Sequence, residues 1–334
     1  MIDALYEKCD LLLQNYTVIN KQYLFDDALL CLSSSLIFTS ADTEADTEKL
    51  SSCKKTLEKN TGFLSNLRGN AKLVIMSKMA LSDDPEKYLA DVMDVYEKIH
   101  QGSQLESSYM VLAAILICDL GRQDEAEDLI VKADQICGLM DTDHPILTAP
   151  EDTSFIMLLA LTDKSVDTII SDIREAYDYL KNTCKISRSA NGIQGLSEVL
   201  AASYGDTKDK CDKAVRIINS FKAHGVKYGT DTELSVLGSL IDLNIDTDTL
   251  VNAIIETDAL LKENKGFKDN QMDETKRLMY ASMLAAEVYG KQSPVIGNSI
   301  ISNTISAVIA KQISLAATIS FNLISAVIPK GDDD

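Results

Sequence analysis

Six residues carry the polar groups that a binding or catalytic site in this chain would use. They are Arg68, His144, Thr148, Asp152, Asn191 and Gln194. An arginine near a helix start can bind a carboxylate or a phosphate, and helix starts in a stacked helical array lie along one edge. The functional interpretation therefore gathers these side chains into a polar pocket. The structural interpretation gives Arg68 a surface ion pair, and gives His144, Thr148 and Asp152 turn and helix-capping roles.

The stretch Asp143–Phe155 is the part of the chain most suggestive of a binding site. His144-Pro145 opens it, and a second proline interrupts the chain again before an apolar run. Thr148 or Asp152 could cap the helix that follows, because either side chain can accept hydrogen bonds from unpaired N–H groups. Capping and a polar pocket at the mouth of the array therefore remain open as alternatives for this stretch.

Neither the histidines nor the cysteines are spaced for a metal or for nucleophilic catalysis. His100, His144 and His224 form no HxxxH or HExxH motif. His100 and His224 occupy equivalent places after amphipathic helices, where a cation is favourable at a helix C-terminus. The seven cysteines are scattered without a CxxC pair, which predicts reduced thiols in the cytosol. We expect no metal and no cofactor.

The acidic composition narrows the classes of partner. The net charge is −19, so a nucleic-acid partner is not expected, because such binding relies on clustered lysine and arginine. Acidic pairs such as Asp26-Asp27 and Asp83-Asp84 are what this composition produces by chance. The sequence contains no GxGxxG, P-loop or GxSxG motif. These absences argue against a recognisable nucleotide-binding or hydrolytic enzyme.

An internal repeat of about 41 residues gives the clearest structural signal. One ladder of apolar residues, at spacings of 41 or 42, marks the first helix of each unit: Ile75, Ile117, Leu159, Leu200, Ile241 and Met283. A second ladder, at spacings of 40 or 41, marks the second helix: Ile99, Leu139, Leu180, Phe221 and Leu261. One such unit cannot bury its own apolar face, so neighbouring units must stack.

The sequence therefore predicts an all-α protein of stacked antiparallel helix pairs, either an open solenoid or a closed α/α toroid. Capping residues such as Asp206 and Asp246 stand between the helices. The stretch Glu233–Leu243 is expected to be an apolar α-helix, and the acidic stretch Ala41–Glu48 a mobile loop or short linker. We expect a helical-repeat domain over residues 1–290 and a separate segment over residues 291–334.

The segment Val295–Ile328 differs from the rest of the chain. It is rich in Ile, Ala and Ser, Lys311 is its only charged residue, and Gly297 and Pro329 bracket it. Polar residues recur at roughly helical spacing along it: Ser299, Asn303, Ser306, Lys311, Ser314, Thr318, Asn322 and Ser325. A helix that is mostly apolar around its circumference requires burial or lipid. It could cap the array, form an oligomer core or partner-binding helix, or enter a membrane.

Several segments resemble the bacterial domain-of-unknown-function family 4003 over roughly residues 1–320. They are FLSNLRGN (Phe63–Asn70), YMVLAAILI (Tyr109–Ile117), the run from Met140 through Ala160, and NGIQGLSEVLA (Asn191–Ala201). The positions that match the family's elements are Phe63, Leu67, Arg68 and Gly69; His144, Pro145, Leu147, Thr148 and Asp152; and Asn191, Gln194, Leu196 and Ser197.

Two features depart from the family pattern. Glu198 stands where a histidine is expected, which weakens any catalytic role requiring that histidine. The tail is rich in Ile and Ser where the family is usually Ala-rich. The resemblance implies a cytosolic bacterial protein with a long apolar C-terminal region, and it implies no established activity.

Three functions follow as hypotheses. We favour a non-enzymatic scaffold that binds a protein or peptide on the concave face of the array or through the C-terminal segment. The first alternative is small-molecule binding, or an unrecognised enzyme, at a polar edge formed by Arg68, His144, Asp152 and Asn191. The second is a cytosolic platform attached to a membrane through residues 295–328. The expected location is cytoplasmic, and both membrane association and homo-oligomer formation remain open.

Overall fold

The computed structural model describes residues 2–23, 28–62, 65–102, 107–143, 153–186, 188–264, 267 and 272–290. Within these ranges every regular element is a helix, which confirms the expected all-α class. His144, Thr148 and Asp152 lie outside the described residues, as does the whole of 291–334. The expected character of that C-terminal segment therefore stays a prediction.

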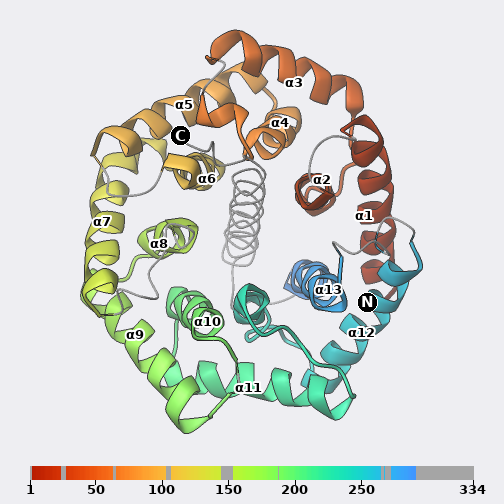
Figure 1. Cartoon of the computed structure of the whole chain (residues 1–334), viewed down its shortest axis with the longest axis vertical. Coiled ribbons are helices and arrows are strands. Elements are labelled where there is room, and N and C mark those ends of the chain that lie inside the picture. Colours follow the sequence, from red (N-terminus) through yellow and green to blue (C-terminus); the bar gives the residue numbers. More distant parts are fainter. Residues whose placement is uncertain are drawn as a thin grey trace, which may run out of the picture.

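The helices form two concentric layers around a common axis (Figure 1). The outer layer consists of α1 (Ile2–Gln22), α3 (Thr47–Asn60), α5 (Pro85–Gly102), α7 (Ala126–Asp143), α9 (Val166–Asp178), α11 (Thr207–Ala223) and α12 (Thr247–Glu263). The inner layer consists of α2 (Ala28–Ser40), α4 (Lys72–Leu81), α6 (Ser107–Asp119), α8 (Thr153–Ala160), α10 (Ala190–Ala202), the 3₁₀ helix η5 (Thr232–Ser239) and α13 (Glu274–Gly290). Inner and outer elements alternate along the chain.

The two layers differ in composition for a physical reason. Outer helices are amphipathic, with one apolar face toward the ring and charged residues toward water. Several inner helices are mostly apolar around their circumference, as in α6, whose only charged residue is the terminal Asp119. The six residues of the first sequence ladder are all buried; five of them lie on inner helices, and Ile241 lies two residues after the end of η5.

Polar caps begin several outer helices where the sequence predicts them. Asp206 accepts a hydrogen bond from the backbone N–H of Asp209 at 3.0 Å, and Asp246 accepts one from Thr249 at 3.0 Å. Each cap satisfies an N–H group that has no partner within the first helical turn. The caps fix the residue at which each outer helix begins, and so they define the short connection from the preceding inner helix.

The stretch Ala41–Glu48 contains the expected short linker, since residues 41–46 connect α2 to α3 without helix. Asp46 caps α3 by accepting from the backbone of Glu48 at 2.9 Å, so the helix begins inside this stretch. The Asn15 side chain of α1 donates to the Thr43 carbonyl at 3.1 Å and accepts from the Ala45 N–H at 2.7 Å. One acidic residue of the stretch, Asp46, thus caps α3, and hydrogen bonds to Asn15 hold the preceding turn against α1.

The predicted α-helix over Glu233–Leu243 is replaced by the 3₁₀ helix η5. Close packing against α10 accompanies this change: a Cβ atom on Gly238 would lie 2.3 Å from Val199 Cγ1. A Cβ atom on Gly192 would likewise lie 2.9 Å from the carbonyl oxygen of Asp231. Both glycines therefore permit a backbone approach that any larger side chain would prevent.

The ring closes through contacts between the first and the last described helices. The α1 helix contacts both α12 and α13. The Tyr6 hydroxyl of α1 donates to a Glu256 carboxylate of α12 at 2.8 Å, and Lys8 lies 3.6 Å from Glu287 of α13. The Tyr16 ring packs edge-on against Phe267 with a centroid distance of 5.3 Å. These contacts join the two ends of the array.

None of the described helices is both long and apolar enough to span a membrane.

Candidate functional site

The Arg68 side chain binds the C-terminal end of α3, the helix that precedes it in the chain. Its Nε donates to the Thr61 hydroxyl at 2.9 Å, and its Nη2 donates to the carbonyl oxygens of Glu58 and Thr61. These carbonyls belong to the last turn of α3 and to the residue that follows it. A cation is favourable there because it satisfies carbonyl groups that have no helical partner. The guanidinium therefore fastens η1 (Asn66–Arg68) to α3.

Asn191 and Gln194 both lie in the first part of α10, but only one of them is exposed. Asn191 faces solvent in the first turn. Gln194 is buried, and its amide donates to a carboxylate oxygen of Glu198 at 3.0 Å. Glu198 is fully buried and is the residue that stands where the family pattern has histidine. The sequence singled out Gln194 as a binding residue and Glu198 only as a departure from the family pattern, and their pairing emerges only from the structure.

The ring separates the described members of the expected polar edge. Arg68 belongs to η1, which contacts α4 and α6, whereas Asn191 and Gln194 belong to α10. Figure 1 places α4 and α10 on opposite sides of the axis. Arg68 therefore does not converge with Asn191 and Gln194, and the roles of His144, Thr148 and Asp152 stay a prediction.

Lysine and arginine side chains at the C-terminal ends of inner helices form a recurring feature that sequence reasoning missed. Lys8 donates to the Thr39 carbonyl at the end of α2, and Lys132 donates to the Thr162 carbonyl just after α8 at 2.5 Å. Arg122 reaches the Leu161 carbonyl at 2.6 Å. Each cation neutralises the negative end of a helix dipole and satisfies orphan carbonyls. No sequence motif predicts this capping of helix ends, because each cation and its carbonyl partner are about 30 to 40 residues apart in the chain.

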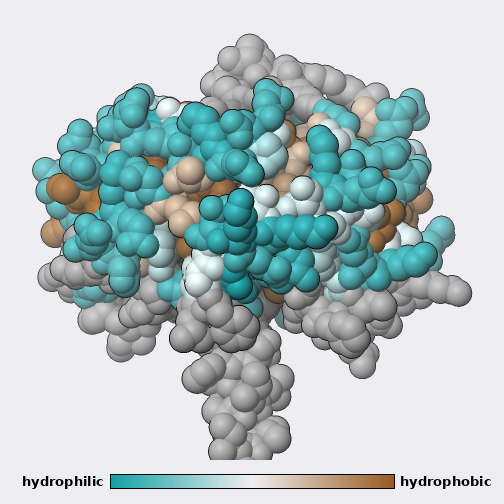
Figure 2. Space-filling view, turned by 90° about the horizontal axis from the view of Figure 1, so that it is seen from above, coloured by the Kyte–Doolittle hydropathy of each residue, from teal (hydrophilic) through white to brown (hydrophobic). Residues whose placement is uncertain are grey.

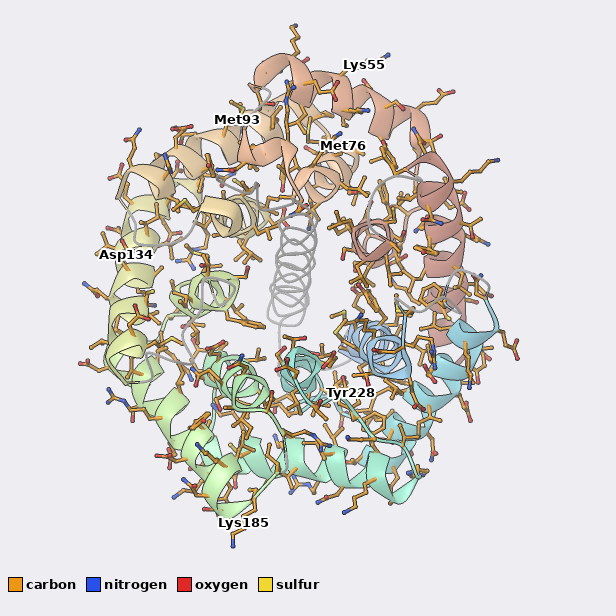
Figure 3. All side chains as sticks on the ribbon, in the orientation of Figure 1. Lys55, Met76, Met93, Asp134, Lys185 and Tyr228 are labelled. Carbon is orange, nitrogen blue, oxygen red and sulfur yellow. The ribbon has the colours of Figure 1, made fainter. Side chains whose placement is uncertain are left out.

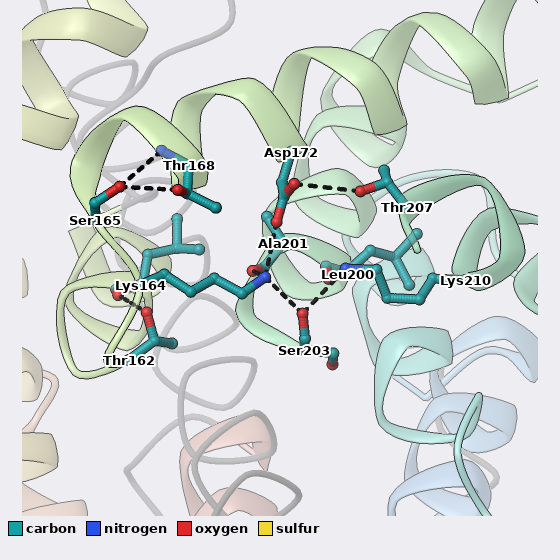
Figure 4. Close-up of polar contacts among 11 residues, drawn as sticks. Thr162, Lys164, Ser165, Thr168, Asp172, Leu200, Ala201, Ser203, Thr207 and Lys210 are labelled. Atoms are coloured by element: carbon teal, nitrogen blue, oxygen red, sulfur yellow. Dashed lines mark hydrogen bonds and ion pairs between the residues drawn. The ribbon is translucent and has the colours of Figure 1, made fainter. Parts of the chain in front are cut away.

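The clearest example lies at the end of α10 (Figure 4). The Lys164 ammonium donates to the carbonyl oxygens of Ala201 at 2.8 Å and Ser203 at 2.7 Å, and pairs with Asp172 at 2.7 Å. Lys210 donates to the Leu200 carbonyl at 2.8 Å and also to Ser203 at 3.0 Å. Two ammonium groups therefore converge on one helix end, with a carboxylate beside the first.

Burial lowers the pKa of Lys210, and the neighbouring charge of Lys164 lowers it further. A lysine with a lowered pKa is sometimes a catalytic base or nucleophile. Here its Nζ is directed at backbone carbonyls in the packed interior, and the side chain is buried. The arrangement supports a structural role for Lys210 at the end of α10.

The cysteines have environments that suppress their reactivity. Burial raises the pKa of Cys9, Cys118 and Cys211 to about 12. Cys137 and Cys184 are only half-buried, and none of the seven cysteines forms a disulfide. Because the thiolate is the nucleophile, the deeply buried cysteines are packing residues. Over the part of the chain that the structure describes, no group of His, Cys, Asp and Glu side chains could hold a metal ion.

An open groove of about 660 Å³ lies between the outer helices α7 and α9. It is lined by Asp134, Gln135, Gly138, Leu139, Ser165, Val166 and Asp167. Its floor includes the apolar Leu139 and Val166, and carboxylates stand on both helices. Figure 3 labels Asp134 on α7. One helical turn before Gln135, the side chain of Val131 is 57% exposed.

Leu139 interrupts an otherwise regular burial pattern. Ile99, Leu180, Phe221 and Leu261 occupy the equivalent places on the second helices, and each is 0% exposed. Leu139 is 38% exposed. Figure 2 shows that one face of the ring is mostly hydrophilic, with hydrophobic residues scattered among polar ones. In the groove, Leu139 is therefore partly exposed to solvent, whereas the residues at the equivalent places on the other outer helices are buried.

A family model matches residues 15–314, which is most of the chain. The description of that family is a protein of unknown function, DUF4003. The chain belongs to the DUF4003 family. This confirms the resemblance carried by the Arg68, His144 and Asn191 segments. No curated protein and no solved structure matches this DUF4003 chain.

Proposed function

We propose that this DUF4003 protein is a non-enzymatic scaffold that binds a protein or peptide through the groove between α7 and α9. The observation that carries the proposal is the exposure of Leu139 at a position that is buried on every other second helix named above. An apolar side chain left in solvent among charged neighbours is a common mark of an interaction surface.

The ring is, in this proposal, an array of helix-pair repeats of about 41 residues closed into an α/α toroid. The regular spacing of the two apolar ladders supports the repeat. The contacts of α1 with α12 and α13 support closure. Such an array is rigid because each pair packs on its neighbours, so a groove on its outer wall keeps its shape without a partner.

The outer wall is a better binding surface than the inner helices. Inner helices such as α2 and α10 consist largely of buried side chains. Alanine substitutions there would remove core packing rather than test a contact. The α7 and α9 groove instead presents partly exposed side chains on two helices that are held in place from behind.

The chemistry of the groove points to a basic, amphipathic partner segment. Leu139 and Val166 offer an apolar floor for one or two large apolar side chains of the partner. Asp134 and Asp167 stand at the sides of that floor, in a chain with a net charge of −19. Lysine or arginine residues that flank the apolar anchor would be attracted to these carboxylates and would speed association.

A direct test uses a labelled helical peptide with leucines on one face and lysines on the other, measured by fluorescence anisotropy. We expect saturable binding that weakens with added salt. Leu139→Lys should weaken it about tenfold or more, because it places a cation in the apolar centre of the interface. Val18→Lys is the matched control, because Val18 is 39% exposed on α1, away from the groove.

The control separates specific docking from general attraction to an acidic protein. If Leu139→Lys and Val18→Lys weaken binding equally, the peptide is held by net charge and the groove has no role. A second peptide with glutamates in place of the lysines should not bind. Urea midpoints of both variants should match that of the unchanged protein, since both positions are partly exposed.

A further inference from the structure

One side of α7 has the residue spacing of a helix-packing surface, although it is exposed. Val131, Asp134, Gln135, Gly138 and Leu139 follow one another at intervals of three or four residues along this side. None of the five is buried. Helices pack on one another through residues at this spacing. These five residues, called the exposed face of α7 below, therefore have the pattern of a surface that receives another helix.

The apolar side chains of the exposed face lie within reach of one partner helix. The side chain of Val131 is 57% exposed and that of Leu139 is 38% exposed. Eight residues separate them, which is about 12 Å along the helix axis. Val166 of α9 lines the groove beside Leu139. A single helix of three or four turns placed on α7 would therefore cover both apolar side chains.

Gly138 is a second, independent observation at the same place. Glycine is among the least favourable residues within a helix, and in the described outer helices it occurs elsewhere only as the last residue of α5. The packing of the ring does not require it, because a Cβ atom on Gly138 would meet no atom within 4 Å. Gly192 and Gly238, in contrast, are required by the contact between α10 and η5. A glycine in the lining of a groove permits the backbone of another chain to approach closely.

We propose that the partner's binding segment is an α-helix that packs on the exposed face of α7 and approaches it most closely at Gly138. This inference rests on the proposed function and specifies the shape of the partner segment. Without a side chain at the crossing point, the two helix axes can come within about 8 Å, the short end of the range for packed helices. Apolar side chains of the partner then contact Leu139 beside the crossing point and Val131 about two turns before it.

An extended partner segment does not fit this surface. Strand addition derives its affinity from hydrogen bonds to the unpaired backbone groups of a sheet edge. The backbone groups within α7 are bonded to one another along the helix. A helix instead offers side chains at the same spacing of three and four residues, which is how helices bind in grooves.

The charges around the groove favour a basic helix of another protein over a second copy of this chain. Asp134 of α7 and Asp167 of α9 both line the groove, and the chain has a net charge of −19. Two copies joined through this face would bring like charges together, which opposes association. A helix with lysine residues beside its apolar side would be attracted instead.

Substitutions of Gly138 test the proposal because stability and binding should change in opposite directions. Binding of the same leucine–lysine peptide to the full chain is measured by fluorescence anisotropy. Gly138→Ala should raise the folding equilibrium constant about threefold, since alanine favours the helix, and yet weaken peptide binding about fivefold. Gly138→Leu should weaken binding about 30-fold or more, because its side chain fills the crossing point. Ser52→Leu is the matched control, since it adds a leucine at an exposed position of α3, and it should leave binding unchanged.

A change in the peptide tests the helical shape separately. One lysine in the middle of the peptide, on the side away from the leucines, is replaced by proline, so that no contact with the groove is lost. Proline inside a helix should weaken binding by about 100-fold, because it breaks the helix that the groove receives. Equal binding of the two peptides would show an extended partner and would overturn the proposal.

The remaining outcomes distinguish failure of this inference from failure of the proposed function. If the unchanged protein binds neither peptide, both fail. If Leu139→Lys weakens binding while Gly138→Ala and Gly138→Leu leave it unchanged, the groove binds a partner but the crossing at Gly138 is wrong. A dimer in light scattering that Gly138→Leu converts to a monomer would assign this face to a second copy and overturn the proposal. If Gly138→Leu lowers the urea midpoint, Gly138→Ala decides the result, because its Cβ atom meets no atom within 4 Å.

Discussion

Replacing Lys164 by methionine removes the cation that holds the end of α10. The ammonium makes two hydrogen bonds to backbone carbonyls and an ion pair with Asp172 at 2.7 Å. The side chain of Lys164 is only 7% exposed. Methionine keeps the length and the apolar stem, so the substitution removes the charge with little change in packing.

The expected loss of stability follows from the polar groups that remain in the protein without the Lys164 ammonium. Two carbonyl oxygens lose a charged donor, and Asp172 keeps only a hydrogen bond from Thr207 at 3.3 Å. Removing one partner of a buried ion pair costs about 3 kcal/mol or more, because the remaining charge is uncompensated. Lys87→Met is the control. Lys87 pairs with Asp91 at 2.6 Å, but its side chain is 68% exposed, so water replaces the lost partner.

Urea denaturation at pH 7, followed by circular dichroism, measures both variants. We expect Lys164→Met to lower the free energy of unfolding by about 3 kcal/mol, and Lys87→Met to leave it unchanged within error. The loss for Lys164→Met should persist in high salt, since buried charges are weakly screened. Equal losses in the two variants, or none in Lys164→Met, would refute the claim that these lysines stabilise the inner helix ends.

Three further predictions concern packing, pH and thiol reactivity. Gly238→Ala should destabilise the protein by about 1–3 kcal/mol through overpacking, and adding Val199→Ala should recover most of the loss in the same urea assay. Burial raises the pKa of Glu233, so its contribution to stability falls as pH rises from the ordinary glutamate pKa through the raised one. Glu233→Gln should therefore gain stability relative to the unchanged protein over that pH range, and a constant difference would contradict the argument. Iodoacetamide should label Cys137 well before the buried Cys118 in peptide maps, and equal rates would contradict the assigned burial.

Much of the local structure could be predicted from the sequence because its causes are local. Asp206 and Asp246 cap outer helices as their spacing indicates, and the residues of the first apolar ladder are buried. These features depend on contacts within a turn of helix or on the period of apolar residues. The expected α-helix over Glu233–Leu243 is wrong because close packing against α10 decided the outcome there.

The candidate site could be predicted less well. Arg68 and Gln194 stood out by residue type, yet the first binds the end of α3 and the second pairs with Glu198. Leu139 fits the ladder as well as any other position in it, and only the packing of α7 against α9 leaves it partly exposed. Residue type indicates what a side chain could do, whereas its neighbours determine whether it is available.

The sequence by itself determined the helical class, the alternation of apolar and amphipathic helices, and the family. Each of these follows from the order and period of residue types along the chain. Only the tertiary structure decided that the first and last described helices meet, through contacts such as that of Tyr6 with Glu256, and that lysines from other elements stabilise the inner helix ends. Closure depends on the small angle between each pair of helices, accumulated around the ring, and no local pattern of residues specifies that sum.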